Sequence, residues 1–147
     1  AGGEVRKAES SHIGIANEIT INEIGQNHPL YKNKVKKFNS PAFNFDEVVK
    51  LPKNAVCLAS NKVNKVQSLY FEISKAKIWG LQYHPEITYE KMISLIEFRK
   101  ERLIEFRKVF KNENEVKNHI SFLKKEILLT KNEKRTLELK NWLSSLN

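Results

Sequence analysis

The sequence predicts an α/β chain with a β-rich first part and a helical second part. Over the first 87 residues, apolar and polar residues alternate in short runs that end at Gly, Pro or Asn, as is typical of strands. From Tyr89 to Asn147 there is neither Gly nor Pro, and apolar residues recur at spacings of three and four, as is typical of amphipathic helices. The two patterns place the division at residue 88.

The strands of the first part are delimited by turn residues. Gly25 ends the second alternating run, and Asn61 to Asn64 reads as a polar turn. Between Gly25 and the third run, Pro29 to Lys32 is expected to form one short helical turn. Strands are expected over residues 3–9, 13–24, 38–49, 55–59, 66–73 and 77–83.

The second part is expected to hold helices over residues 89–110, 116–129 and 133–146, with breaks at 112–118 and 131–132. The hexapeptide Leu-Ile-Glu-Phe-Arg-Lys occurs at 95–100 and again at 103–108. On a continuous α-helix, an offset of eight residues returns to within about 80° of the same face. Both copies are therefore expected to contribute to one apolar stripe.

The positive charge of the chain is spread along its whole length. The 26 Lys and Arg residues exceed the 17 Asp and Glu residues by nine, and residues 89–147 carry +5 of this excess against +4 for residues 1–88. The densest basic run, Lys32 to Lys37, is short, and no RNA-binding or zinc-finger motif is recognisable. The excess is interpreted as a dispersed solvated surface, and nucleic-acid binding is not expected.

Several classes of protein and site are excluded by the remaining composition. The only cysteine, Cys57, excludes a disulfide framework and an all-cysteine metal site, and a cytoplasmic location is expected. No run of about 18 apolar residues occurs, and residues 1–10 have no signal-peptide core, so no membrane association is expected. No glycine-rich phosphate loop is present, and His12, His28 and His119 lack partners at ligand spacing. Neither a cofactor nor a metal is expected, and these three histidines are expected at the surface.

The candidate catalytic residues are His84 and Glu86, in the stretch Gly-Leu-Gln-Tyr-His-Pro-Glu at 80–86. On an extended backbone, residues two apart point to the same side, so the two side chains can lie together at the end of a strand. Pro85 between them fixes φ and stiffens the pair. A carboxylate that accepts from one imidazole nitrogen leaves the other nitrogen to deprotonate a nucleophile. The spacing alone favours the other interpretation, a surface histidine beside a helix-capping glutamate.

This stretch closely resembles the Gly-x-Gln-Phe-His-Pro-Glu signature of class I glutamine amidotransferases, whose catalytic triad is Cys, His and Glu. Three further segments resemble the family in the same order. Residues 2–5 resemble the Gly-Gly-x-Val after the nucleophile helix, residues 44–52 resemble His-x-Asp-x-Val-x-x-Leu-Pro, and residues 59–67 resemble the next strand pair. The resemblance covers residues 1–88 and is closest to the GMP-synthase-like amidotransferases.

The resemblance implies a flavodoxin-like three-layer α/β sandwich with a mostly parallel central sheet. Residues 1–88 would be the C-terminal part of that domain, with a β-hairpin region at 55–73. Residues 89–147 would be a helical extension packed on the domain or on a partner. The implied substrate is glutamine, and the implied catalytic residues in this chain are His84 and Glu86.

Two departures from the family pattern limit what the resemblance implies. Asn44 stands where the family usually has His beside the glutamine pocket, and the substrate-binding residues of this chain are not identified. The Gly-x-Cys-x-Gly-x-Gln elbow lies upstream of the Gly-Gly step in the family, whereas this chain opens on Ala-Gly-Gly. Cys57 has no flanking glycines and is interpreted as a small apolar strand residue. The expectation is a partial domain, inactive alone, whose nucleophile lies in an N-terminal half.

Three functional hypotheses follow. The first is a partial glutamine amidotransferase that delivers ammonia to a synthetase partner, or that forms a homodimer through its helices. The second is a non-catalytic binding or regulatory module with the same fold. The third is a basic helical interaction protein. The ammonia acceptor and the pathway are not encoded in any recognisable pattern.

Overall fold

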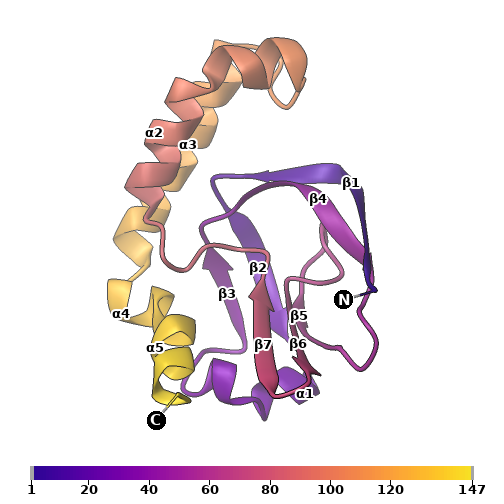
Figure 1. The fold of residues 1–147 in the computed structure, drawn as a ribbon. Coiled ribbons are helices and arrows are strands. Elements are labelled where there is room, and N and C mark those ends of the chain that lie inside the picture. Colours follow the sequence, from indigo (N-terminus) through magenta and orange to yellow (C-terminus); the bar gives the residue numbers. More distant parts are fainter. Residues whose placement is uncertain (1, 147) are drawn as a thin grey trace.

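The computed structural model describes residues 2–146 (Figure 1). Its first part consists of seven strands, which are β1 (Glu4–Ile13), β2 (Ala16–Ile21), β3 (Lys37–Ser40), β4 (Phe43–Lys50), β5 (Val56–Ser60), β6 (Ser68–Ile73) and β7 (Ala76–Leu81). The short helix α1 (Glu23–Gln26) and the 3-10 turn η1 (Pro29–Tyr31) separate β2 from β3. The predicted α/β class with a β-rich first part is confirmed.

The strands form two sheets, one of β1 with β4 and one in the order β3-β2-β5-β6-β7. Every strand pairing among residues 2–146 is antiparallel, and β5 pairs with β6 in the expected hairpin region. The mostly parallel sheet implied by the family resemblance is therefore not formed by these strands. For β5 with β6 and for β6 with β7 the reason is the short connection, since parallel neighbours need a crossover of about a dozen residues or more.

The second part is helical, as its spacing of apolar residues predicts. The elements are α2 (Tyr89–Phe98), the π-helical turn η2 (Arg102–Phe106), α3 (Glu113–Leu129), α4 (Asn132–Arg135) and α5 (Leu137–Ser144). The break expected at 112–118 is wrong, because the Asn112 side chain accepts from the Glu115 backbone N–H at 3.1 Å and starts α3 as its N-cap. Within residues 2–146, no helix combines the length and apolar character that a bilayer span requires.

The two copies of the repeated hexapeptide adopt different structures. The first copy completes α2, whereas the second forms η2 and ends at Lys108, whose φ is +53°. A hydrogen bond from the Arg107 N–H to the Arg102 carbonyl, five residues apart, widens the helix at this point. The continuous α-helix expected over 89–110 is therefore wrong, and the phenylalanines of the two copies, Phe98 and Phe106, are 86% and 78% exposed.

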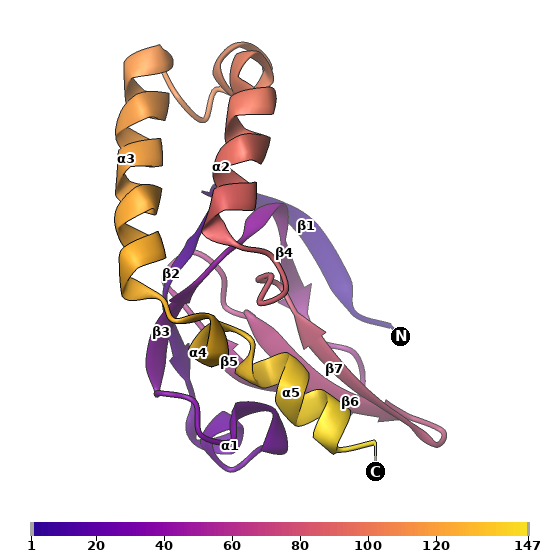
Figure 2. The ribbon, with the colours of Figure 1, turned by 90° about the vertical axis from the view of Figure 1, so that its left-hand side faces the viewer.

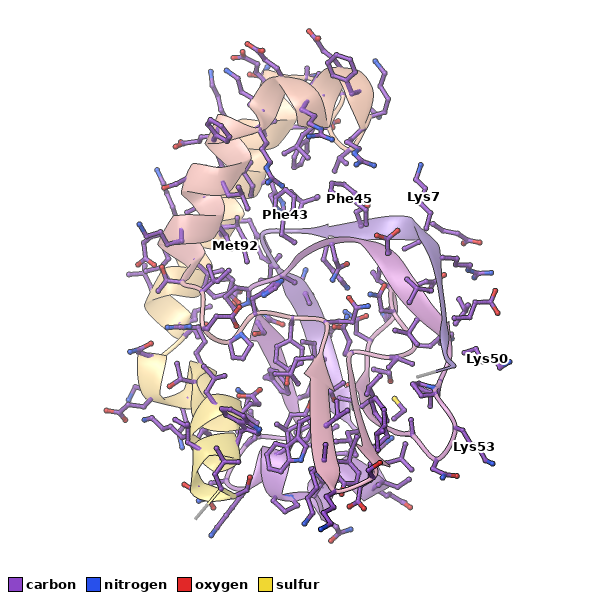
Figure 3. All side chains as sticks on the ribbon, viewed as in Figure 1. Lys7, Phe43, Phe45, Lys50, Lys53 and Met92 are labelled. Atoms are coloured by element: carbon purple, nitrogen blue, oxygen red, sulfur yellow. The ribbon has the colours of Figure 1, made fainter. Side chains whose placement is uncertain are left out.

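The first hydrophobic core lies between the helices and the β1–β4 sheet. Its buried members are Ile13, Ile15, Tyr89, Ile93, Ile96, Leu103, Phe110, Val116, Ile120 and Leu123. Figure 3 shows Phe43 and Phe45 of β4 on the side facing these helices, with Lys7, Lys50 and Lys53 at the far edge. Arg99 lies 5.3 Å from the ring centroid of Phe43, and Arg107 lies 4.4 Å from that of Phe45. Both distances are within the range of a cation–π interaction.

Gly14, in the turn between β1 and β2, allows α2 and α3 to approach the strands closely. Its φ of +84° lies in the left-handed region that favours glycine. A Cβ at this position would lie 2.7 Å from a methyl carbon of Leu123 and 2.9 Å from one of Ile96. The turn therefore fits against both helices only without a side chain.

The second core lies on the five-stranded sheet. Its buried members are Ala16, Ile19, Ile21, Leu30, Tyr31, Ala42, Leu58, Ala59 and Tyr83. Figure 2 shows α4 and α5 lying across this sheet, while α2 and α3 extend side by side beyond its end. Asn141 of α5 donates to the carbonyls of Leu30 and Lys32 at 2.9 and 3.0 Å. The helices after residue 130 are thus joined to the β-rich part by specific polar contacts.

Candidate functional site

His84 and Glu86 lie in the loop between β7 and α2, and their side chains meet. Nδ1 of His84 is 2.8 Å from Oε1 of Glu86. An ionised carboxylate can only accept a hydrogen bond, so Nδ1 is the donor to Glu86, and in the neutral ring the lone pair is then on Nε2. The two side chains are 38% and 51% exposed, so a reacting group can approach the pair from outside. An imidazole in this tautomer can deprotonate a thiol.

The backbone of this loop is fixed by residues from other elements. The N–H of His84 donates to the Pro41 carbonyl at 2.6 Å, and the N–H of Ile87 donates back to the His84 carbonyl at 3.1 Å. On the strand side, the Asn44 amide donates to the Gln82 carbonyl at 3.2 Å. The orientation of His84 is therefore set by long-range contacts as well as by Pro85.

Asn44 lies on β4 beside the loop. Its amide oxygen is buried and has no hydrogen-bond partner among residues 2–146. Its amide nitrogen, through the contact with Gln82, reaches the backbone two residues before His84. The position at which the sequence departs from the family pattern therefore contacts the segment that leads to the candidate pair.

Cys57 lies in β5, as its apolar flanking residues predict. Burial raises the pKa of the Cys57 thiol, and a hydrogen bond from Sγ to the Ala59 carbonyl at 3.3 Å offsets this only partly. A thiol with a raised pKa is protonated near neutral pH and is a poor nucleophile. These surroundings favour the interpretation of Cys57 as a strand residue.

The expectation that His12, His28 and His119 lie at the surface is wrong for His12, which is 4% exposed. Nε2 of His12 accepts from the Gln67 amide at 2.8 Å, because burial lowers the pKa of His12 and keeps the ring neutral. His28 and His119 are half-buried. Nδ1 of His28 accepts from the Leu30 N–H, and Nε2 of His119 donates to the Ile13 carbonyl. His12 and His119 thus have partners far away in the sequence, whereas His28 caps the turn that follows it.

The neutral state of His12 makes stability dependent on pH. Because the pKa of His12 is lowered on folding, the unfolded chain binds the proton first as the pH falls below about 6.5. The free energy of unfolding should then decrease by up to about 1.4 kcal/mol per pH unit from this residue. Urea unfolding between pH 7.5 and 5.5 should show a smaller loss of stability in His12→Gln than in wild type.

Burial lowers the pKa of His28 as well, so His28 also contributes to the pH dependence of stability. A second variant is needed to separate its contribution from that of His12. His28→Asn keeps an acceptor at the N-cap of η1 and removes the contribution of His28 alone. Equal pH dependence in wild type and His12→Gln would contradict the assignment of a neutral buried ring to His12.

The helices α4 and α5 contribute polar groups to the His84 loop that no sequence pattern indicated. Arg135, which is 8% exposed, donates from its guanidinium to the carbonyl of Pro85 and, at 2.9 Å, to that of Ile87. The Tyr83 hydroxyl donates to Glu138 at 2.8 Å. The residues before, within and after the His84–Glu86 pair are thus bonded to α4 and α5.

The carboxylate of Glu138 ends a buried chain of hydrogen bonds. Since Tyr83 donates to Glu138, the Tyr31 hydroxyl must donate to Tyr83, over 3.0 Å, and accept from Ser68, over 2.6 Å. Burial raises the pKa of Tyr83 and that of Tyr31, so both hydroxyls stay protonated. Lys34 completes the network with an ion pair to Glu138 at 2.8 Å. Within residues 2–146, no group of three His, Cys, Asp or Glu residues is placed to hold a metal.

Three comparisons connect this geometry with known proteins, although no family model matches the chain. It is 35% identical over 92 residues to the gamma-glutamyl-L-1-hydroxyisopropylamide hydrolase of a Pseudomonas species, covering 60% of the chain and 31% of that protein. It is 28% identical over 95 residues to one subunit of the glutamine-hydrolyzing GMP synthase of Methanococcus vannielii, covering 65% of the chain and 47% of that protein.

The fold is similar to that of a glutamine amidotransferase from Thermotoga maritima, with a TM-score of 0.64 at 16% identity. This similarity covers 98% of the chain, so it includes the helical part, and 54% of the other protein. The chain spans less than half of the length of the two curated relatives. The sequence matches and the shared fold agree with the signature around His84, and the chain is similar to class I glutamine amidotransferases in both sequence and fold.

Proposed function

We propose that this chain is part of a glutamine amidotransferase that hydrolyses the side-chain amide of glutamine through a Cys-His-Glu triad and delivers ammonia. In the complete protein, a Cys upstream of Ala1 attacks the amide carbon while Nε2 of His84 takes the thiol proton. The carbon–nitrogen bond breaks, ammonia leaves with that proton, and a γ-glutamyl thioester forms. Water then attacks the thioester, with His84 as base, and releases glutamate and the free thiol. Glu86 orients His84 and stabilises its charged form.

The observation that carries the proposal is the 2.8 Å contact between His84 and Glu86 within the family signature. It supplies a base and the group that orients it at the end of a strand. The relatives support the class of substrate, since one is named as a hydrolase of a γ-glutamyl amide and the other as part of a glutamine-hydrolyzing synthase. The chain alone lacks the nucleophile and should not release ammonia.

A synthetase that accepts the ammonia is the proposed partner, because the name of the Methanococcus vannielii relative makes it one subunit of a GMP synthase. Residues 1–88 are proposed to be the C-terminal part of the amidotransferase domain and residues 89–147 its helical extension, which could also hold a homodimer together. The proposed location is the cytoplasm. Neither a cofactor nor a metal is invoked.

The test is an assay of the full-length protein with glutamine, in which ammonia and glutamate should appear in equal amounts. Residues 1–147 expressed alone should release neither. A γ-glutamyl alkylamide assayed in parallel distinguishes an ammonia-producing enzyme from a hydrolase of larger γ-glutamyl amides. Glutamine binding without turnover would instead favour the non-catalytic module, and salt-sensitive binding to nucleic acid would favour the basic interaction protein.

A further inference from the structure

We infer that Arg135 and Glu138 are positioning residues that hold the His84–Glu86 loop in its working conformation. This inference rests on the proposed function and assigns a role to α4 and α5 in it. The two residues lie three positions apart in the sequence, and both are buried, at 8% and 1% exposure. Neither touches the side chain of His84 or Glu86 in the described contacts, so they act through the backbone and through Tyr83.

The residues on either side of each member of the pair carry these contacts. The side chain of Tyr83 and the carbonyls of Pro85 and Ile87 are bonded to α4 and α5, whereas the side chains of His84 and Glu86 are bonded to each other. α4 and α5 therefore hold the turn over residues 84–87 through its backbone and through Tyr83, and they leave the His84–Glu86 pair free to react.

The guanidinium of Arg135 is suited to this task by its shape. Its Nη1 bridges the carbonyls of Pro85 and Ile87, which flank Glu86, while Nη2 donates to the Asn132 side chain in the same helix. Three donors fixed in one plane set the separation of the two carbonyls and hence the direction of the Glu86 side chain. A lysine carries a single ammonium on a flexible stem and cannot reproduce this bridge.

Glu138 fixes the other end of the loop. It accepts from Tyr83, the residue before His84, and its second oxygen is paired with Lys34. Lys34 also donates to the carbonyl of Lys134, next to Arg135 in the chain. Lys34 thus connects Glu138 to the backbone of the residue before Arg135.

The test compares Arg135→Lys and Arg135→Met with wild type in the full-length protein. Both variants should lower kcat for glutamine hydrolysis about 10- to 100-fold and leave KM within about twofold, because a misplaced base slows chemistry without removing substrate contacts. Asn141→Ala is the matched control, since it removes two hydrogen bonds of α5 to Leu30 and Lys32 without touching the loop. It should retain wild-type kcat.

Amide hydrogen exchange provides a readout that does not need activity. In Arg135→Met, exchange in the peptide over residues 82–88 should accelerate at least about tenfold, while exchange over residues 56–73 stays unchanged. If wild type shows no glutaminase activity but this exchange pattern appears, the proposed function fails and the positioning role stands. Wild-type kcat together with wild-type exchange in Arg135→Met would overturn the inference.

Discussion

Replacing His84 with Ala is expected to lower kcat for glutamine hydrolysis by the full-length protein on the order of 10³-fold, within the range that general acid–base groups contribute. The variant keeps the nucleophile and the substrate pocket but loses the only group that we place to take the thiol proton and return it to ammonia. KM should change little for the same reason. Ammonia release under saturating glutamine measures the effect, and unchanged release would remove His84 from the mechanism.

Two further variants show whether the loss is specific. Glu86→Gln keeps the size of the side chain and a neutral acceptor for Nδ1, and its effect should be smaller than that of His84→Ala because Glu86 is half exposed. His28→Asn retains the cap of η1 and lies on a different element, so it should leave kcat unchanged. A similar loss in all three variants would indicate a general disturbance of the fold.

Replacing Glu138 with Leu is expected to reduce the free energy of unfolding by about 3 to 5 kcal/mol, the cost of breaking a buried ion pair from one side. Lys34 has a side chain only 5% exposed, and the substitution would leave its ammonium without its carboxylate. Burial lowers the pKa of Lys34 and Glu138 opposes this, so the ammonium depends on the carboxylate for its charged state. The Tyr83 hydroxyl would lose its acceptor as well. Urea-induced unfolding measures the change.

A double-mutant cycle separates the ion pair from the space that it fills. Adding Lys34→Met to Glu138→Leu replaces both charges with apolar groups and should restore at least half of the lost stability. The exposed pair Lys100–Glu113 serves as the control, since its side chains are 38% and 58% exposed and Glu113→Leu should leave the unfolding midpoint nearly unchanged. Equal effects of Glu138→Leu and Glu113→Leu would contradict the importance of the buried pair.

The parts of the site that depend on neighbours in the sequence could be predicted. His84 and Glu86 are two residues apart with a proline between them, so the short spacing allows their side chains to meet. The strand β5 could be expected from a short apolar run, β6 from alternation, and the helices from the three- and four-residue spacing, because these patterns are local. The family resemblance of residues 80–86 supplied the chemical role that spacing left open.

The parts that depend on distant residues could not be predicted. Arg135 contacts Pro85, which is 50 residues away in the sequence, and Gln67 contacts His12, which is 55 residues away. Neither pairing produces a periodic pattern in the sequence from which it could be predicted. The burial of His12 follows from that partner and not from its neighbours in β1. The repeated hexapeptide shows the same limit, because identical residues complete an α-helix in one copy and a π-helical turn in the other. The packing around each copy decides between the two.

The hold of α4 and α5 on the His84 loop also sets an order of events for a newly made chain. The ribosome synthesises His84 and Glu86 about 50 residues before Arg135. Because synthesis proceeds from the N-terminus, earlier segments can fold first. The strands can pair during this interval, while the loop still lacks its bonds from residues 132–138. Catalytic competence would then arise last. A nascent chain without α4 and α5, or a nicked chain that has lost them, would contain the His84–Glu86 signature in a loop without the bonds to Arg135 and Glu138.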